Sequence, residues 1–300
     1  MRDHNTAEQS PGLLPATNGA VAFAPSRPYP AYSPADCPFE TVIIDVTHRC
    51  NMGCHNCYIP NRTIPDLDAG WLKEIFAQLP RGTFVRLVGA EPTMRQDLPA
   101  LISSIRSFGH HPVMLTNGLK LTNREYLQEL RRAGLRVAYL SLNGAFDDDL
   151  YDAIDGMRCA ARKRQAFDNL RAERVFTSLG MIVVRGVNEH AVADLWQAAL
   201  GARNVREFHL RSIGSIGRFM QTDPLSLDEL QQAFSRASGI APDAFTRHER
   251  TTSSYDFTCG RIRVQLTEWP DLGSTTRGRL TPEGQIVPFF EHVMENEGGY

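Results

Sequence analysis

The sequence has no long apolar run and no excess of charge of one sign. No stretch approaches the ~18–20 apolar residues of a membrane-spanning helix, and the chain does not open on a charged segment followed by an apolar one. Its 300 residues carry 32 lysines and arginines against 34 aspartates and glutamates, a formal net charge of −2. This balance creates no field that would concentrate nucleic acid or an anionic membrane. We therefore expect a soluble, cytoplasmic protein with neither as a partner.

Cysteine is also scarce, and its distribution is uneven. Six cysteines in 300 residues are too few for a disulfide scaffold. Cys37, Cys159 and Cys259 stand alone, whereas the other three fall within eight residues of the stretch 47–58. Such a cluster needs a chemical reason, and thiolates that hold a metal centre need a reducing compartment.

The three clustered cysteines, Cys50, Cys54 and Cys57, admit two metal centres. Thiolates select zinc, Cu(I) or iron–sulfur clusters. A structural zinc site requires a fourth ligand. No second Cys-x-x-Cys follows, but His48 or His55 could complete a zinc site. A [4Fe–4S] cluster held by only three cysteines instead leaves one iron open to a further ligand.

The pattern Cys-x-x-x-Cys-x-x-Cys at 50–57 resembles the signature of the radical S-adenosylmethionine (SAM) superfamily. The resemblance implies that these cysteines ligate a [4Fe–4S] cluster whose open iron chelates the amino and carboxylate groups of SAM. It further implies that an electron from the cluster cleaves SAM to a 5′-deoxyadenosyl radical. The residue before the third cysteine is often aromatic in the family but is Asn56 here. We expect Tyr58 to take part of that role beside the adenine.

Apolar runs rich in β-branched residues alternate with segments of helical periodicity, which favours right-handed βαβ units in a parallel α/β sheet. The resemblance implies an open (β/α)6 partial TIM barrel over residues 38–212, although a flat doubly wound sheet would give the same pattern. In both layouts functional groups gather at the carboxyl ends of the strands. We expect strands at 40–47, 83–88, 111–116, 135–142, 175–184 and 205–210, and helices at 71–79, 97–108, 123–133, 162–173 and 189–200.

We predict three parts of the chain. Residues 1–36 contain six prolines and few large apolar residues, which predicts a disordered N-terminal arm. Residues 37–212 form the partial-barrel core. Residues 213–300 form a small α+β C-terminal extension that covers the substrate side. This extension is expected to contain a helix over 226–237 that begins with a Ser226–Glu229 capping box, a strand over 261–267 and a hairpin over 279–287.

Directly after the second expected strand stands Gly89-Ala90-Glu91-Pro92. It resembles the Gly-Gly-Glu-Pro motif that holds the amino group of SAM in the family, with Ala90 in place of the second glycine. Small residues let the backbone approach a ligand, and a carboxylate accepts hydrogen bonds from an ammonium.

Polar residues end the next three expected strands: Asn117, then Ser141 and Asn143, then Arg185. Ser-Leu-Asn-Gly at 141–144 resembles a family pattern, commonly Ser-Leu-Asp-Gly, that reaches the ribose or carboxylate of SAM. Val-Arg-Gly-Val-Asn at 184–188 resembles a segment of the molybdenum-cofactor and peptide-modifying branches whose arginine pairs with the SAM carboxylate. A guanidinium suits that role because it grips a carboxylate through two hydrogen bonds. Simple turns after a strand are the alternative for Asn117 and for the 141–144 segment, and Asn188 could equally cap the helix that follows.

The leading functional hypothesis is a radical SAM enzyme that abstracts hydrogen from a small-molecule, biosynthetic substrate and receives electrons from a donor such as flavodoxin or ferredoxin. Modification of a ribosomal peptide is an alternative, and a non-catalytic, zinc-stabilised α/β binding protein is an alternative of another class. Only Cys259 lies beyond residue 160, so we expect no auxiliary clusters. No segment resembles a cobalamin-binding domain.

Cys259 and Tyr255 are the candidate catalytic residues. A thiol has a weaker bond to hydrogen than an aliphatic carbon, so Cys259 could quench a substrate radical, and Tyr255 is a second candidate donor. This role requires the thiol to point into the cavity above the cluster, near the ends of the barrel strands. The alternative is that Cys259 is a buried cysteine that packs as a small apolar residue.

Overall fold

Strands and helices alternate along most of the chain in the computed structural model, which describes residues 30–57, 59, 61–212, 223–247, 254–268 and 276–288. The first half contains β1 (Thr41–Thr47), α1 (Ala69–Gln78), β2 (Phe84–Gly89), α2 (Leu98–Ser107), β3 (His111–Thr116), α3 (Arg124–Ala133) and β4 (Val137–Ser141). The second half contains α4 (Asp148–Asp155), α5 (Ala160–Ala172), β5 (Phe176–Val183), α6 (Val192–Gly201), β6 (Val205–Ser212), α7 (Leu227–Ser238), β7 (Thr246–Arg247), β8 (Ser254–Cys259), β9 (Ile262–Thr267), β10 (Arg277–Leu280) and β11 (Ile286–Pro288).

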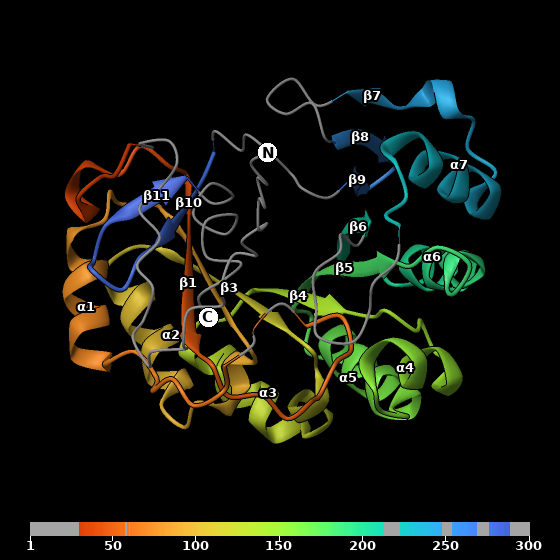
Figure 1. Cartoon of the computed structure of the whole chain (residues 1–300). Coiled ribbons are helices and arrows are strands. Elements are labelled where there is room, and N and C mark those ends of the chain that lie inside the picture. The colour runs from red at the N-terminus through yellow and green to blue at the C-terminus, as the bar shows by residue number, and fades with distance from the viewer. Residues whose placement is uncertain are drawn as a thin grey trace, which may run out of the picture.

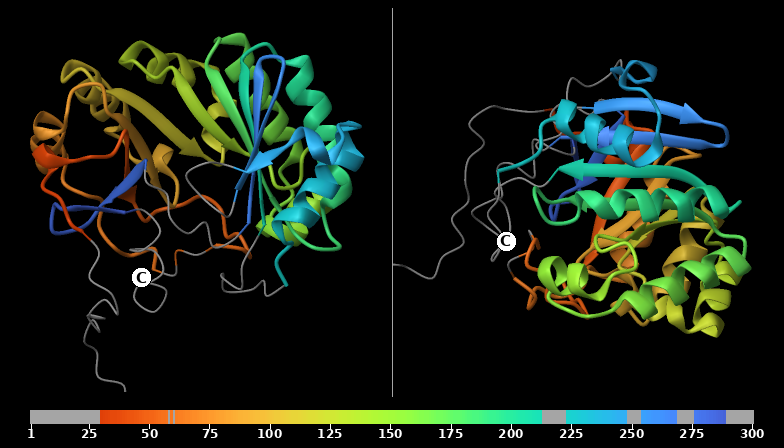
Figure 2. Two further views of the ribbon diagram at one scale, coloured as in Figure 1. Left: turned by 90° about the horizontal axis from the view of Figure 1, so that it is seen from above. Right: turned by 90° about the vertical axis from the view of Figure 1, so that its right-hand side faces the viewer.

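All the strands join one sheet in the order β11-β10-β1-β2-β3-β4-β5-β6-β9-β8-β7. Neighbouring strands from β1 to β6 are parallel, as the βαβ pattern predicts. The curved sheet carries its helices on the convex side (Figure 1), and the two further views show the same layering (Figure 2). The fold is therefore the expected open, mostly parallel partial barrel.

The residues after 212 widen this sheet at both edges. Strand β9 lies parallel beside β6, and β10 lies parallel beside β1. Antiparallel partners then follow, β8 beside β9 and β11 beside β10. The predicted strand, hairpin and Ser226–Glu229 capping box are all confirmed.

The two faces of the sheet differ in chemistry. The outer face carries residues such as Ile44, Leu87 and Leu140, which belong to the main hydrophobic core beneath the helices. Because side chains alternate along a strand, their neighbours Ile43, Arg86 and Tyr139 lie on the opposite, inner face. We use these two names below.

Helix α4 and strands β7 and β8 were not predicted. Helix α4 spans only eight residues and lies in an acidic stretch. Strand β7 spans two residues and pairs with β8. The predicted arm spans residues 1–36, of which 1–29 lie outside the described part of the chain. Within residues 30–36, Tyr32 forms a β-bridge with Ile286. Within the described residues, no helix is long and apolar enough to cross a membrane.

Candidate functional site

The cysteine loop leaves the carboxyl end of β1 and is fixed to α4. The His55 backbone N–H donates to the Ile154 carbonyl at 3.0 Å, and its ring Nδ1 lies 3.0 Å from the Ala153 carbonyl. Gly156, at the end of α4, adopts a φ of +64° against the His55 ring. The unpredicted helix α4 therefore positions the loop.

The three loop thiols are reduced and partly buried, and N–H groups point at two of them. Met52 N–H donates to Cys50 Sγ at 3.4 Å, while Ile59 N–H and Arg62 Nη2 donate to Cys57 Sγ at 3.4 and 3.0 Å. Hydrogen bonds of this kind stabilise metal-bound thiolates.

Burial, together with the Asp155 carboxylate and Cys50, raises the pKa of the Cys54 thiol, although Lys163 opposes the shift. A coordinated metal deprotonates such a thiol. Among the described residues, no three His, Cys, Asp or Glu side chains form a site for a single metal ion. Three clustered thiols, two of which accept N–H hydrogen bonds, fit a cluster with three protein ligands.

The Gly89–Pro92 segment lies directly against the base of the cysteine loop. Ala90 N–H donates to the Thr47 carbonyl at 2.9 Å, and Glu91 N–H donates to the Arg49 carbonyl at 3.0 Å. Gly89 has a φ of +112°, and a Cβ there would overlap the Thr47 carbonyl. Glycine is therefore required for the close approach of the two segments.

Glu91 is 1% exposed, and its carboxylate joins the ends of β2 and β3. Oε1 accepts from Thr93 N–H at 3.1 Å, Thr93 Oγ1 at 2.6 Å and Thr116 Oγ1 at 2.8 Å, and Oε2 accepts from Asn117 N–H at 2.7 Å. Pro92 is buried beside it and begins a short 3₁₀ turn. The carboxylate thus sets the relative position of the predicted SAM residues Glu91 and Asn117.

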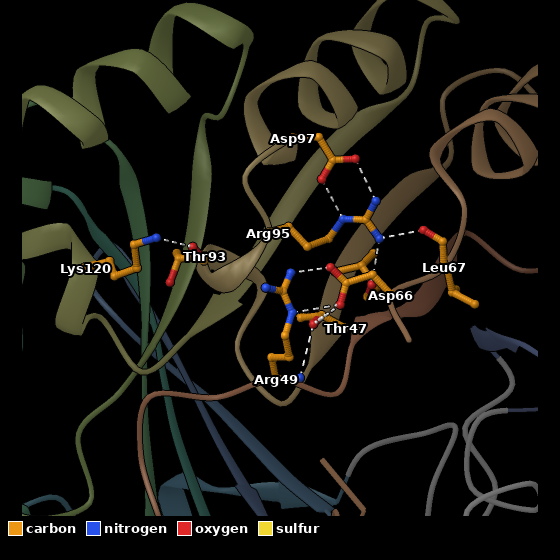
Figure 3. A network of polar contacts seen from close by, with 9 residues as sticks. Thr47, Arg49, Asp66, Leu67, Thr93, Arg95, Asp97 and Lys120 are labelled. Atoms are coloured by element: carbon orange, nitrogen blue, oxygen red, sulfur yellow. Dashed lines mark hydrogen bonds and ion pairs between the residues drawn. The ribbon is translucent and has the colours of Figure 1, made fainter. Parts of the chain in front are cut away.

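Two arginines that were not predicted hold the same region together (Figure 3). Arg95, 4% exposed, donates from Nη1 to the carbonyls of Val46 and Leu67 at 2.8 and 2.7 Å and forms a bidentate pair with Asp97 at 2.8 and 2.7 Å. Arg49, next to Cys50 in the chain, pairs with Asp66.

Lys163 is a third residue that was missed. Its side chain is buried, and Nζ donates to the Asn117 carbonyl at 2.7 Å and the Ser141 carbonyl at 3.1 Å. Asn117 Nδ2 in turn donates to Asn51 Oδ1 at 2.8 Å and lies 3.8 Å from Cys50 Sγ. The only available signal was a lysine on the buried side of a predicted helix.

Asn143 belongs to a buried polar cluster at the ends of β4 and β5. Its Nδ2 donates to Asp155 Oδ1 at 2.9 Å, and its Oδ1 accepts from Ile182 N–H at 3.0 Å. Asn188 closes the cluster through hydrogen bonds to the carbonyls of Asn143 and Ile182, and its side chain makes no helix cap.

Arg185 lies at the same end of the sheet and contacts the start of α7. Its Nη1 and Nη2 pair with the two carboxylate oxygens of Glu229 at 2.7 and 2.8 Å. Further bonds reach the carbonyls of Asp223 and Pro224. In this structure the guanidinium therefore ties β5 to α7.

Cys259 lies at the end of the sheet away from this site, and Tyr255 packs against the core beside α7. Cys259 pairs with Ile262, at the amino-terminal end of β9, whereas the cysteine loop follows the carboxyl end of β1. Both side chains pack against the main hydrophobic core, and the Tyr255 hydroxyl donates to Asp228 of α7 at 3.0 Å. Hydrogen donation to a substrate radical requires the thiol to lie near the carboxyl ends of the barrel strands. The observed position of Cys259 at the other end of the sheet argues against that role. Tyr58, the expected adenine neighbour, lies outside the described residues.

Comparison with known proteins gives a match to the family model described as "Radical SAM superfamily" over residues 44–198. This span contains the three loop cysteines and all of the polar strand-end residues described above.

Three curated relatives are each 30% identical to the chain. A 7,8-dihydro-6-hydroxymethylpterin dimethyltransferase of Methanocaldococcus jannaschii aligns with 58% of this chain and 36% of its own length. A GTP 3′,8-cyclase of Picosynechococcus aligns with 68% and 66%, and a PqqA peptide cyclase of Bradyrhizobium diazoefficiens with 53% and 43%. The matched part of this chain therefore spans between about a third and two thirds of these relatives.

Among solved structures, the chain is similar to Streptococcus suis SuiB bound to S-adenosylmethionine. The TM-score is 0.59 at 14% identity, over 83% of this chain and 59% of that one. This likeness concerns the fold of the partial barrel.

Proposed function

This chain belongs to the radical SAM superfamily, and from that premise we propose that it abstracts a hydrogen atom from a carbon of a small-molecule, biosynthetic substrate. It is an enzyme whose cofactors are a [4Fe–4S] cluster and SAM, and it requires a reductant as well as a substrate. When bound, these cofactors supply the reductive cleavage of SAM that yields a 5′-deoxyadenosyl radical.

The observation that carries the proposal is the convergence of the cysteine loop with the Gly89–Pro92 segment. The backbone bonds from Ala90 and Glu91 to residues 47 and 49 tie the two together. Cys50, Cys54 and Cys57 are proposed as the cluster ligands, and their distance from Glu91 is set by this pairing.

We assign binding roles to the remaining strand-end residues. Gly89, Ala90, Glu91 and Pro92 would border the amino group of SAM, and Asn117, Ser141 and Asn143 would border its ribose and carboxylate. Lys163 acts through others, because it holds the carbonyls of Asn117 and Ser141 at a fixed separation. Arg185 is proposed to reach the SAM carboxylate, which requires it to exchange Glu229 for the ligand.

A small molecule is the favoured substrate, and peptide modification is the alternative. The relatives divide between the two classes, since two are named for a pterin and for GTP and one for a peptide. A flavodoxin or ferredoxin is the proposed electron donor, and residues 213–300 are proposed to cover the substrate side.

The test is anaerobic reconstitution with iron and sulfide, followed by assay for 5′-deoxyadenosine with dithionite. The wild-type protein should become brown, bleach on reduction and cleave SAM. Cys50→Ala, Cys54→Ala and Cys57→Ala should each lose most of the iron and all 5′-deoxyadenosine formation. Cys259→Ala is the matched control and should retain both. A triple Cys→Ala variant that still cleaves SAM, or a colourless zinc protein, would contradict the proposal.

A further inference from the structure

The inner face of the sheet carries arginines from four strands, β2, β10, β6 and β9. Ile43 of β1 lies opposite Arg86 of β2 and Arg279 of β10, so all three side chains share the inner face. On the other side of the barrel, Arg211 of β6 lies opposite Thr267 of β9, and Arg263 of β9 lies opposite Glu207 of β6. None of these four arginines and none of their partners Ile43, Thr267 and Glu207 belongs to the hydrophobic core beneath the helices.

The curvature of the sheet brings these arginines together. The ring of Tyr139, on β4, lies 6.2 Å from the ring of buried His209, on β6, in an edge-on arrangement across β5. The charges of Arg86, Arg211 and Arg277 all act on both of these rings, although the three arginines come from β2, β6 and β10. The inner face is therefore a single concave, cationic surface.

Several donors on this surface have no acceptor among the residues that the structure describes. The Nε of Arg86, the Nε of Arg211 and the Oγ of Ser178 are buried and make no hydrogen bond in the described part of the chain. Ser178 lies directly opposite both Tyr139 and Glu207 in the sheet. Buried donors without acceptors are costly, so their grouping on one surface points to a ligand that accepts hydrogen bonds.

The charge of the surface favours an anionic ligand. Arg279 is paired with Asp45 at 2.5 Å, and Arg263 with Asp256 at 3.0 Å. Arg86 and Arg211 each keep a buried Nε without an acceptor in the described part of the chain. Glu207, opposite Ser178, adds one carboxylate to the same face. Burial, and then the neighbouring arginines, lower the pKa of His209, so the imidazole adds no charge at neutral pH.

We propose that the inner face binds an oxyanion of the small-molecule substrate, a phosphate or a set of carboxylates, through Arg86, Arg211 and Ser178. Arg211 is the last residue but one of β6, at the end of the sheet that carries the cysteine loop, and Arg86 lies further inside. The anion would thus anchor one end of the substrate below the site proposed for SAM. This inference rests on the proposed function, because it identifies the chemical class of the substrate.

The test is calorimetric titration of the reconstituted protein with pyrophosphate and, separately, with citrate, at constant ionic strength set by sodium chloride. Arg86→Gln and Arg211→Gln should each weaken binding of the preferred anion by about tenfold or more, because each removes a charged hydrogen-bond donor. Ser178→Ala should weaken it less. Arg203→Gln, an exposed arginine before β6, is the matched control and should bind as the wild type does.

Preference for pyrophosphate would identify a phosphoryl group, and preference for citrate would identify carboxylates. Arg86→Lys preserves the charge and serves as a control for folding. It should keep the wild-type melting temperature and part of the affinity for the anion. Unchanged affinity in both Gln variants, or no binding of either anion, would overturn the proposal. Binding of an acidic peptide in place of both anions would overturn the small-molecule assignment. Formation of 5′-deoxyadenosine without substrate reports separately on the proposed function.

Discussion

The hydroxyl of Tyr139 lies directly over the Cα of Gly180, where any Cβ would overlap the phenol ring. The φ of Gly180 is not in the left-handed region, so glycine is needed there for space and not for backbone freedom. The contact fixes the Tyr139 ring on the inner face, beside Arg86 and Arg211. Burial raises the pKa of Tyr139 although both arginines lower it, so the phenol remains protonated at neutral pH.

Gly180→Ala should destabilise the protein by about 1–3 kcal/mol, because an added methyl in a filled space forces neighbouring groups to move. The same substitution in a Tyr139→Ala background should cost much less, since the two residues are in contact and their effects are not additive. Urea unfolding of the two single variants and the double variant measures the coupling. Gly201→Ala, where an added Cβ meets nothing within 4 Å, is the control. Strict additivity of Gly180→Ala and Tyr139→Ala would contradict the argument.

Arg185→Ala should weaken SAM binding by about tenfold while the cluster spectrum stays intact, because a guanidinium bound to a carboxylate contributes roughly 1.5–3 kcal/mol. Glu229→Gln is the matched variant, since it removes the ion pair but leaves the arginine available. It should leave SAM affinity unchanged or increase it. Equilibrium dialysis with SAM makes the comparison. If neither variant changes SAM affinity and both lower the melting temperature equally, Arg185 only joins β5 to α7.

The order of strands β1–β6 and the cysteine ligand candidates could be predicted from sequence because both depend on local patterns. β-branched runs, helical periodicity and cysteine spacing all act over a few residues. In the structure, Asp68 and Asn123 cap α1 and α3 through side-chain hydrogen bonds from the N–H groups of Trp71 and Tyr126. Curvature of the sheet came only from the family resemblance, and the structure confirms it.

The residues that support the site could not be predicted, because their partners are distant in sequence. Lys163 contacts carbonyls 46 and 22 residues away, and Arg95 contacts a carbonyl 49 residues away. The placement of Cys259 could not be predicted for the same reason. Its strand runs antiparallel to β9, and this reversal places the thiol at the end of the sheet away from the cysteine loop. No local pattern around Cys259 reports that direction.

His209 should make the protein less stable as the pH falls below about 6.5. Burial first, and then Arg211, Arg277, Arg86 and Arg263, lower its pKa well below the ordinary value of 6.5. The unfolded chain therefore takes up a proton below pH 6.5 that the folded chain does not. Stability falls with decreasing pH by up to about 1.4 kcal/mol per pH unit for this one group.

His209→Gln should flatten this part of the curve of unfolding free energy against pH between about 5 and 7. An amide at this position can still bond Thr267 Oγ1, which lies 2.9 Å from His209 Nε2. The exposed His190→Gln serves as the control. The same slope in His209→Gln and in the wild type would show that other groups cause the acid sensitivity.

Arg62→Leu should lower the midpoint potential of the cluster. Arg62 Nη2 lies 3.0 Å from Cys57 Sγ, so the guanidinium brings a positive charge and a hydrogen bond to a proposed ligand sulfur. Both the charge and the hydrogen bond stabilise the reduced cluster relative to the oxidised one. A charged hydrogen bond contributes about 1.5 kcal/mol, and for a one-electron couple this corresponds to a decrease of up to about 60 mV. Arg62→Lys keeps the charge and should recover part of the shift, whereas Arg158→Gln, which removes an exposed arginine paired with Asp149, should have no effect. A redox titration followed by electron paramagnetic resonance measures the potential with no need for substrate. Equal potentials in Arg62→Leu and in the wild type, with equal iron content, would mean that the guanidinium does not act on the cluster.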